Sequence, residues 1–284
     1  MGNGDMPQKT NPPPYISPSS SSLFDQCQLK WKFRYIDRLP DPPGKAAILG
    51  TFAHEVLEFL LQEAPEERTK QKAKILAGQI WPKFEENGDF IALGLTESEI
   101  RKFKWDSWKA IEGLWKLEEP SEVKVEDTER DVQVSIGGVP FRGIIDRVER
   151  EGSQLVISDY KSGKAPKKRY AGDKLNQVLL YAAAINELDG ELPNKAQLLY
   201  LGQRTIPAEV SEATIAGPIT KLRNIWNELN SACASGTFST TTGPLCAWCP
   251  YVANCSDGET EVRQRVRNNR VRTDAPALEI LGLV

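Results

Sequence analysis

Residues 142–163 run RGIIDRVEREGSQLVISDYKSG, and this stretch decides the fold. Apolar and polar side chains alternate on both sides of Gly152-Ser153, which is the pattern of two half-buried strands. Gly152-Ser153 itself has the glycine-first form of a two-residue hairpin turn. We therefore predict antiparallel strands over about 139–149 and 154–161.

A third strand is predicted just before this pair. Gly137-Gly138 is another two-residue turn signal. The apolar residues that precede it alternate with polar ones: Val132, Val134 and Ile136. Strand-like alternation begins near residue 122, so we expect a three-strand antiparallel meander from about 122 to 161.

Helical periodicity flanks the meander on both sides, because apolar residues recur there at intervals of three and four. Before the meander, helices are expected over 23–35, 46–63, 68–86 and 97–117. After it, they are expected over 174–188 and 211–234, with a short buried strand over 196–201 between them. The core order is then helix, three strands, helix, strand, which is an α/β fold.

The two turns also predict which residues face one another. Paired residues in a two-residue hairpin have a constant sum of residue numbers, which places Asp146 opposite Asp159 and Glu129 opposite Asp146. Directly opposed side chains lie on one face, about 4.5–5.5 Å apart. Lys161 shares that face because side chains alternate along a strand. The sequence thus predicts three carboxylates and a lysine in one row, set in an apolar wall that includes Ile144.

Such a row points to metal-dependent chemistry. Carboxylates this close together resist joint ionisation, and a divalent cation compensates their charge. A bound metal ion lowers the pKa of its water and polarises a phosphoryl oxygen, and Lys161 beside it would stabilise developing charge. This chemistry suits phosphodiester hydrolysis. The alternative interpretation is a salt-bridge ladder on the protein surface.

With these residues, the sequence resembles the RecB-like branch of the PD-(D/E)XK nucleases. The matching motifs are Gly143-Ile-Ile-Asp146 and Asp159-Tyr-Lys161, followed by a helix. The resemblance implies a restriction-endonuclease-like αβββαβ core with an N-terminal helical region. It also implies Mg²⁺ or Mn²⁺ as cofactor, bound by Asp146, Asp159 and the main-chain carbonyl of Tyr160.

Two helix motifs extend the resemblance. Gly50-Thr-Phe-Ala-His54 is similar to the family's G-x-x-x-H helix, whose histidine reaches the metal. Gln177-Val-Leu-Leu-Tyr181 is similar to the Q-x-x-x-Y helix, whose polar pair faces the active site and DNA. Glu129 fits a family glutamate before the central strand, with Glu126 as a nearby competitor. Each motif also has an ordinary structural interpretation, as a packed histidine or a pair on a helix surface.

Four of the five cysteines suggest a second metal site. The spacing Cys246-x-x-Cys249-x5-Cys255 is compact enough for metal ligands, with zinc or unliganded loop cysteines as the first interpretations. Together with Cys27, however, it resembles the iron–sulfur nucleases, including the CRISPR-associated exonucleases and the AddB-type nuclease domain. That resemblance implies a 4Fe–4S cluster on these four cysteines, with Zn²⁺ as the alternative. Cys233 falls outside the pattern and is expected to be a small buried side chain.

The domain organisation expected from these motifs has three parts. Residues 1–15 are expected to be disordered, 16–258 to form the nuclease domain, and 259–284 to form a basic tail. Within the domain, we expect a helical part at 46–120, the catalytic sheet core at 122–205 and a C-terminal iron–sulfur-binding segment at 246–255.

The function predicted is that of a DNA exonuclease acting at free, preferentially single-stranded, ends in recombination, repair or phage DNA metabolism. The alternatives are a non-catalytic DNA-end-binding or assembly subunit, for example with a helicase partner, and a structure-specific endonuclease. A net charge of −3 requires any DNA contact to be local. The candidate residues are Lys164, Lys167, Lys168 and Arg169. No secretory signal or membrane-length apolar run is apparent, so we expect a cytoplasmic protein, or one of the host cytoplasm if the source is viral.

Overall fold

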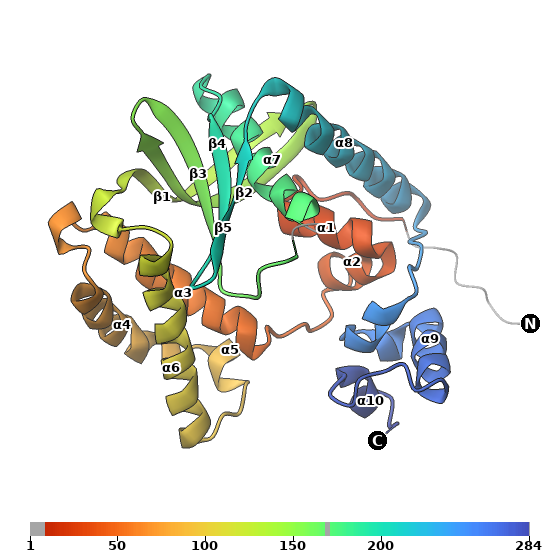
Figure 1. Ribbon diagram of the computed structural model, residues 1–284. Coiled ribbons are helices and arrows are strands. Elements are labelled where there is room, and N and C mark those ends of the chain that lie inside the picture. The colour runs from red at the N-terminus through yellow and green to blue at the C-terminus, as the bar shows by residue number, and fades with distance from the viewer. Residues whose placement is uncertain (1–8, 168–170, 284) are drawn as a thin grey trace, which may run out of the picture. The chain divides into compact units, whose positions relative to one another are not determined.

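The computed structural model describes residues 9–167 and 171–283, and the chain divides into two compact units (Figure 1). The first unit combines both ends of the chain, residues 1–41 and 222–284, and the second comprises residues 42–221. No described helix combines the length and the apolar character that crossing a lipid bilayer needs.

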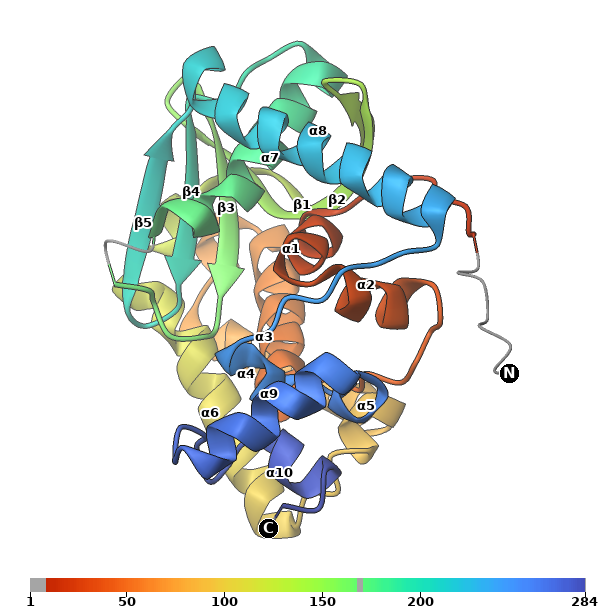
Figure 2. The same cartoon turned by 90° about the vertical axis from the view of Figure 1, so that its right-hand side faces the viewer.

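The second unit is built on a five-stranded mixed sheet in the order β1-β2-β3-β4-β5. Its strands are β1 (Lys124–Ile136), β2 (Val139–Glu151), β3 (Gln154–Lys161), β4 (Lys195–Tyr200) and β5 (Arg204–Glu209). The first three strands form the predicted antiparallel meander, and β4 runs parallel to β3. A parallel pair needs a crossover, which α7 (Ala171–Asp189) supplies across one face of the sheet (Figure 2).

The sheet confirms the predicted core order and adds one strand to it. The added strand is β5, which was not predicted from the sequence. It pairs with β4 alone and forms an edge of the sheet. Its six residues, RTIPAE, are short, largely polar and interrupted by Pro207. An edge strand tolerates proline because one side of its backbone needs no partner, so the usual strand signal is weak here.

Strand register follows the predicted turns over most of its length. Between β2 and β3, pairing runs from Glu151↔Gln154 to Arg147↔Ser158, as a turn at Gly152-Ser153 requires. The predicted direct pairing of Asp146 with Asp159 is wrong, because the ladder ends one residue earlier. Ile144 does not belong to an apolar wall either, since it is 49% exposed.

The four helices of the second unit that precede the sheet pack into one apolar core with it. They are α3 (Lys45–Gln62), α4 (Lys70–Glu85), α5 (Gly88–Ile91) and α6 (Glu97–Glu112), with short 3₁₀ turns at Pro65–Glu67, Gly113–Lys116 and Pro120–Glu122. Aromatic rings of Phe52, Trp81 and Phe84 meet edge to face at the centre of this core. Tyr160 and Leu199 extend the core to the sheet, so these helices cover the sheet face that carries Tyr160.

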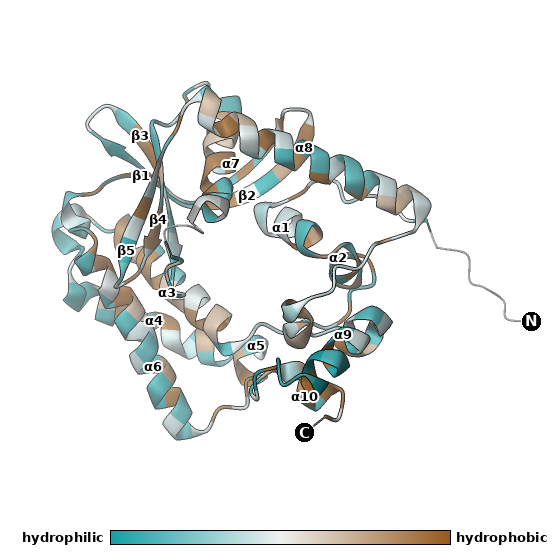
Figure 3. Cartoon of the chain, turned by 45° about the vertical axis from the view of Figure 1, so that its right-hand side comes forward, coloured by the Kyte–Doolittle hydropathy of each residue, from teal (hydrophilic) through white to brown (hydrophobic). Residues whose placement is uncertain are grey.

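The first unit contains the remaining helices. They are α1 (Pro18–Gln26), α2 (Gln28–Tyr35), the end of α8 (Glu212–Ser235), α9 (Ser256–Arg267) and α10 (Pro276–Ile280), with 3₁₀ turns at Pro244–Trp248 and Val252–Asn254. The single helix predicted over 23–35 is wrong: Cys27 adopts an extended conformation that ends α1 and begins α2. The basic tail after residue 259 is helical in α9, whose surface is mostly hydrophilic (Figure 3). Cys233 is fully buried, as expected.

Candidate active site

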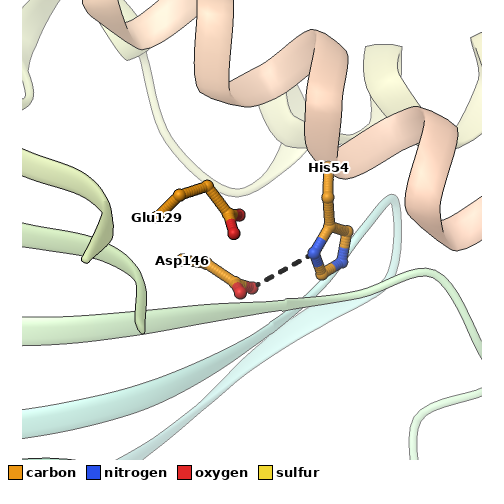
Figure 4. Close-up of side chains that lie close together, drawn as sticks. All are labelled: His54, Glu129 and Asp146. Carbon is orange, nitrogen blue, oxygen red and sulfur yellow. Dashed lines mark ion pairs between the residues drawn. The ribbon is translucent and has the colours of Figure 1, made fainter. Parts of the chain in front are cut away.

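Three potential metal ligands from three different elements converge in the second unit. His54 on α3, Glu129 on β1 and Asp146 on β2 each place one ligand atom within 4.8 Å of the others. Figure 4 shows the three side chains pointing toward one another, with Nδ1 of His54 lying 3.4 Å from Oδ2 of Asp146. Imidazole nitrogen and carboxylate oxygen are both suitable ligands for a divalent cation.

The glycine of the G-x-x-x-H motif explains how His54 reaches the sheet. A Cβ atom on Gly50 would lie 2.9 Å from Oγ of Ser162, which directly follows β3. Glycine at position 50 therefore lets α3 approach the end of β3 closely without displacing the Ser162 hydroxyl. His54 is four residues further along the same helix, so its side chain projects from the same face toward Asp146.

Glu129 reaches the site through an unusual backbone conformation. It lies between the pairs Thr128↔Arg147 and Arg130↔Ile145, which places it opposite Asp146 as the turn at Gly137-Gly138 predicts. Its φ of 49° is left-handed, which costs a non-glycine residue about 1 kcal/mol or more. Strain of this kind concentrates at functional sites.

Its competitor Glu126 lies at the register shift between Val125 and Asp127. Glu126 forms an ion pair of 2.5 Å with Arg150, and it is not among the residues of the metal-ligand group. Of the two glutamates that the sequence left open, the structure therefore brings Glu129 to the site.

Asp159 and Lys161 lie on the face of β3 that α7 covers. Nζ of Lys161 is 2.5 Å from Oδ2 of Asp159. Gln177 on α7 bridges the pair: its Nε2 donates to Oδ1 of Asp159 at 2.9 Å, and its Oε1 accepts from Lys161 at 3.2 Å. The same Nε2 donates to the Tyr181 hydroxyl at 3.2 Å. The structure thus brings together the residues that the sequence nominated in the D-x-K and Q-x-x-x-Y motifs.

The glycine of the Gly143-Ile-Ile-Asp146 motif makes room for this helix. A Cβ atom on Gly143 would lie 2.5 Å from Cε1 of Tyr181, so the tyrosine ring packs directly on the glycine backbone. Gly143 thereby positions α7, and α7 positions Gln177 over Asp159. Before the structure, only the family resemblance pointed to a glycine at this position.

The electrostatics of the site favour a cation. Burial raises the pKa of Asp146 to about 6. Burial, reinforced by the charge of Asp146, likewise raises the pKa of Asp159 to about 6. Burial and then Asp146 and Glu58 raise the pKa of Glu129 to about 7. Burial lowers the pKa of His54, although Asp159 opposes the shift, so the imidazole is neutral and free to act as a ligand at neutral pH.

A buried polar network lies on the face of the sheet opposite Asp159 and Lys161. It was not predicted from the sequence. The Arg147 side chain is fully buried and pairs with Glu118 at 2.9 Å and with Glu149 at 2.8 Å. It also donates a hydrogen bond of 2.9 Å to the hydroxyl of Tyr160. Ser158 completes the network by donating to Glu149. The available signal was a pair of charged residues, Arg147 and Glu149, on the face of β2 that otherwise carries apolar side chains such as Phe141 and Ile145.

The four nominated cysteines line a cavity of about 260 Å³ within the first unit. Cys27 lies at the break between α1 and α2, while the 3₁₀ turn Pro244–Trp248 carries Cys246 and is followed by Cys249. Cys255 caps α9, and its Sγ accepts a hydrogen bond of 3.2 Å from the main-chain amide of Gly258. In the described part of the chain, no three cysteine sulfurs lie within 4.8 Å of one another.

The nominated DNA-contacting lysines lie in the loop that follows β3. Lys164 and Lys167 are exposed, and Lys168 and Arg169 lie outside the described residues. Gln203 holds this loop with two main-chain hydrogen bonds: its Oε1 accepts from Ala165 at 2.9 Å, and its Nε2 donates to Gly163 at 2.8 Å. Gln203 therefore fixes the start of the loop at Gly163 and Ala165, and the side chains of Lys164 and Lys167 face solvent.

Comparison with known proteins gives a family match. The model of the PD-(D/E)XK nuclease superfamily matches residues 15–256. Similar solved structures include a candidate exonuclease from Eubacterium rectale, 11% identical, with a TM-score of 0.44 over 80% of this chain and 84% of that chain. Another is SSO0001, 15% identical, with a TM-score of 0.34 over 74% of this chain and 94% of that chain. No curated protein matches.

Proposed function

The chain belongs to the PD-(D/E)XK nuclease superfamily, and from this premise we propose that it is a Mg²⁺- or Mn²⁺-dependent DNA exonuclease acting on free, single-stranded ends. One observation carries the proposal. A potential metal site of His54, Glu129 and Asp146 lies at the same strand ends as the Asp159–Lys161 pair. Neutral imidazole, buried carboxylates and a lysine are the groups that metal-assisted phosphodiester hydrolysis uses.

The proposed roles follow from the contacts. His54, Asp146, Asp159 and the main-chain carbonyl of Tyr160 would hold the divalent cation. When bound, this cation supplies an activated water and polarises the scissile phosphate. Nζ of Lys161, which hydrogen bonds to Gln177, stabilises the negative charge that develops on the phosphate oxygens.

Glu129 and Tyr181 complete the proposed catalytic set. The pKa of Glu129, raised to about 7, allows its carboxyl group to exchange a proton near neutral pH. Tyr181 holds Gln177 in place through its hydroxyl, and Gln177 in turn orients Asp159. Lys164 and Lys167 contact phosphates of the DNA backbone in this proposal, and exposed lysines of this kind make binding sensitive to salt.

We propose that Cys27, Cys246, Cys249 and Cys255 hold a 4Fe–4S cluster. All four cysteines line one cavity of about 260 Å³, which has room for a group larger than a single ion. Four thiolates are also the usual ligand set of such a cluster.

Both units contribute to the proposed nuclease domain of residues 16–258, because the family model spans 15–256. The cluster would join Cys27 to Cys246–Cys255 and close a loop of about two hundred residues, which restricts the unfolded chain. In this proposal its role is structural.

Exonuclease activity is tested with matched linear and covalently closed circular single-stranded DNA, each incubated with Mg²⁺ or Mn²⁺. We expect degradation of the linear strand and protection of the circle. Cleavage of the circle at a comparable rate would instead identify an endonuclease. Binding of linear ends without cleavage of either substrate would identify a non-catalytic end-binding subunit.

A further inference from the structure

Two neighbouring helices of the second unit, α4 and α6 (Figure 1), both carry tryptophan and several lysines. Between them lies a cavity of about 330 Å³, which we call the Trp–Lys groove. Its lining residues are Phe52, Ala77, Gly78, Trp81, Lys104, Trp108 and Ile111. Nothing in the catalytic row described above involves these side chains.

Lysine ammonium groups cover the indole rings along this surface. Nζ of Lys104 lies 4.1 Å from the ring centroid of Trp81, and Nζ of Lys74 lies 5.0 Å from that of Trp108. A third such pair, 4.7 Å apart, joins Lys109 to Trp105. Cation–π pairs at exposed sites are worth only about 0.5–1 kcal/mol each, so the lysines can move away when a flat ring competes for the indole.

Exposure distinguishes Trp105 and Trp108 from Trp81, which belongs to the buried core. Trp105 is 59% exposed, and Trp108 is partly exposed at the edge of the groove. Ala77 and Gly78 keep the α4 side of the groove open, because a Cβ atom built on Gly78 meets nothing within 4 Å. Large exposed aromatic surface on a rigid helix, with space beside it, is suited to stacking against planar rings.

The charge of the surface complements a polyanion. The α4 helix carries four lysines and a single acidic residue, whereas α6 carries four basic and four acidic residues, so the excess positive charge lies on α4. Among the described residues, neither Lys74 nor Lys104 forms an ion pair with a carboxylate. Their ammonium groups therefore need no carboxylate to be displaced before they contact phosphates.

The groove lies away from the catalytic row. Phe52 lines the groove while His54 faces the carboxylates, and two residues of an α-helix are separated by about 200° around its axis. The groove is therefore on the opposite side of α3 from the proposed metal ligands.

We propose that the Trp–Lys groove, together with the exposed ring of Trp105 and with Lys74, which lies over Trp108, is an auxiliary binding site for single-stranded nucleic acid. Bases stack on Trp105 and Trp108, and Lys74 and Lys104 contact the flanking phosphates. Interleaved aromatic and basic side chains are the usual means of binding single strands without sequence preference. The proposal rests on the proposed function, since a nuclease that acts on single strands gains from holding the substrate at a second point.

The test compares two charge-matched double variants. Lys74→Glu/Lys104→Glu changes the groove, and Lys83→Glu/Lys102→Glu makes the same charge change on other faces of the same helices, nine residues from Lys74 and two residues from Lys104. Binding of a fluorescent oligonucleotide of about 20 nucleotides is measured in EDTA, so that no cleavage occurs. We expect the groove variant to bind about 10-fold more weakly. The slope of the logarithm of its binding constant against the logarithm of salt concentration should be smaller in magnitude by about 1.4, which corresponds to two lost phosphate contacts. The control should bind within about 2-fold of wild type.

Further measurements locate the contact and separate it from catalysis. Trp105→Ala should weaken binding by about 5-fold or more, the loss of one stacked base. Photo-cross-linking with 5-iodouracil oligonucleotides should label the peptide that contains Trp105 and Trp108. Cleavage of a substrate of about four nucleotides should be unchanged in the groove variant, because so short a strand occupies only the catalytic row.

The groove proposal fails if both double variants bind equally well, or if cross-links avoid 101–112. It also fails if a polyglutamate peptide occupies the groove and oligonucleotides do not, since the partner is then an acidic protein segment. Loss of the proposed function would be recognised separately. In that case no substrate is cleaved by wild type, while the binding difference between the two variants remains.

Discussion

The main-chain amide of Tyr160 donates a hydrogen bond of 2.6 Å to Oδ2 of Asp146 where β2 and β3 stop pairing. The carboxylate of Asp146 thus accepts a hydrogen bond where the next main-chain hydrogen bond between β2 and β3 would otherwise form. Since side chains alternate along β3, Asp159 and Lys161 face α7, while the Tyr160 ring faces the opposite side and hydrogen bonds to Arg147. The buried network around Arg147 therefore fixes the backbone that carries Asp159 and Lys161, the proposed catalytic residues.

Tyr160→Phe tests this connection. The variant keeps the ring but removes the acceptor of the Arg147 hydrogen bond inside the core, so we expect a loss of about 1–2 kcal/mol in the free energy of unfolding. We also expect weaker Mg²⁺ binding, because the amide of Tyr160 orients Asp146. Urea unfolding and Mg²⁺ titration measure the two effects, and Tyr35→Phe at a partly exposed position is the control. Unchanged stability and Mg²⁺ binding would refute the connection.

The contact between Gly143 and Tyr181 predicts that substitutions at these two positions have non-additive effects on the cleavage rate. Gly143→Ala places a Cβ atom against the tyrosine ring, so we expect α7 to shift and cleavage to fall about 10-fold or more. In a Tyr181→Ala background the clash is absent, and the same change should cost much less. Gly217→Ala, on an open surface of α8, is the control for a glycine substitution. Additive effects of the two changes would show that the packing contact does not control activity.

Metal-free protein should lose stability as pH rises. The pKa values of Asp146 and Asp159, about 6, and of Glu129, about 7, lie above the usual value of about 4 for unfolded carboxyl groups. These groups therefore contribute stability below about pH 4, and the contribution is lost as pH rises through about 6 to 7. In EDTA, the melting temperature of wild type should fall between about pH 5 and pH 8. The fall should be smaller for Asp146→Asn.

Saturating Mg²⁺ should reverse this trend, because the cation binds the ionised carboxylates and stabilises the folded state by mass action. The stabilisation by Mg²⁺ should be larger at about pH 8 than at about pH 5, since protons compete with the metal. A melting temperature that rises with pH in EDTA would contradict the assignment of these pKa shifts.

The cysteine site predicts a difference between two cysteine variants. Protein purified without oxygen should contain about four iron atoms per chain. Cys27→Ser removes a side chain that lines the cavity and should lose the cluster and its visible absorbance. Cys233→Ser lies outside the cavity and should retain both. Stoichiometric zinc without iron would identify a zinc site instead.

Much of the fold could be predicted because two-residue turns leave little freedom in register. Gly137-Gly138 and Gly152-Ser153 correctly located the meander and placed Glu129 opposite Asp146. The same arithmetic could not show that β2 and β3 separate at Asp146, because that depends on a side-chain hydrogen bond.

Other features left weak or misleading signals in the sequence. Apolar periodicity continues through 23–35, so it gave no sign that Cys27 interrupts the helix. The short polar strand β5 lacks the alternation of a buried strand. The buried position of Arg147 contradicts the usual exposure of charged residues, because its partners come from distant parts of the chain, such as Glu118.

The central claim is that the carboxylate row binds the cation needed for phosphodiester hydrolysis. The most direct test is cleavage of end-labelled single-stranded DNA by wild type and Asp159→Asn, with Mg²⁺, with Mn²⁺ and in EDTA. We predict metal-dependent cleavage by wild type and a loss of about 100-fold or more in the variant. Equal cleavage by the two proteins, or cleavage by wild type in EDTA, would contradict the claim.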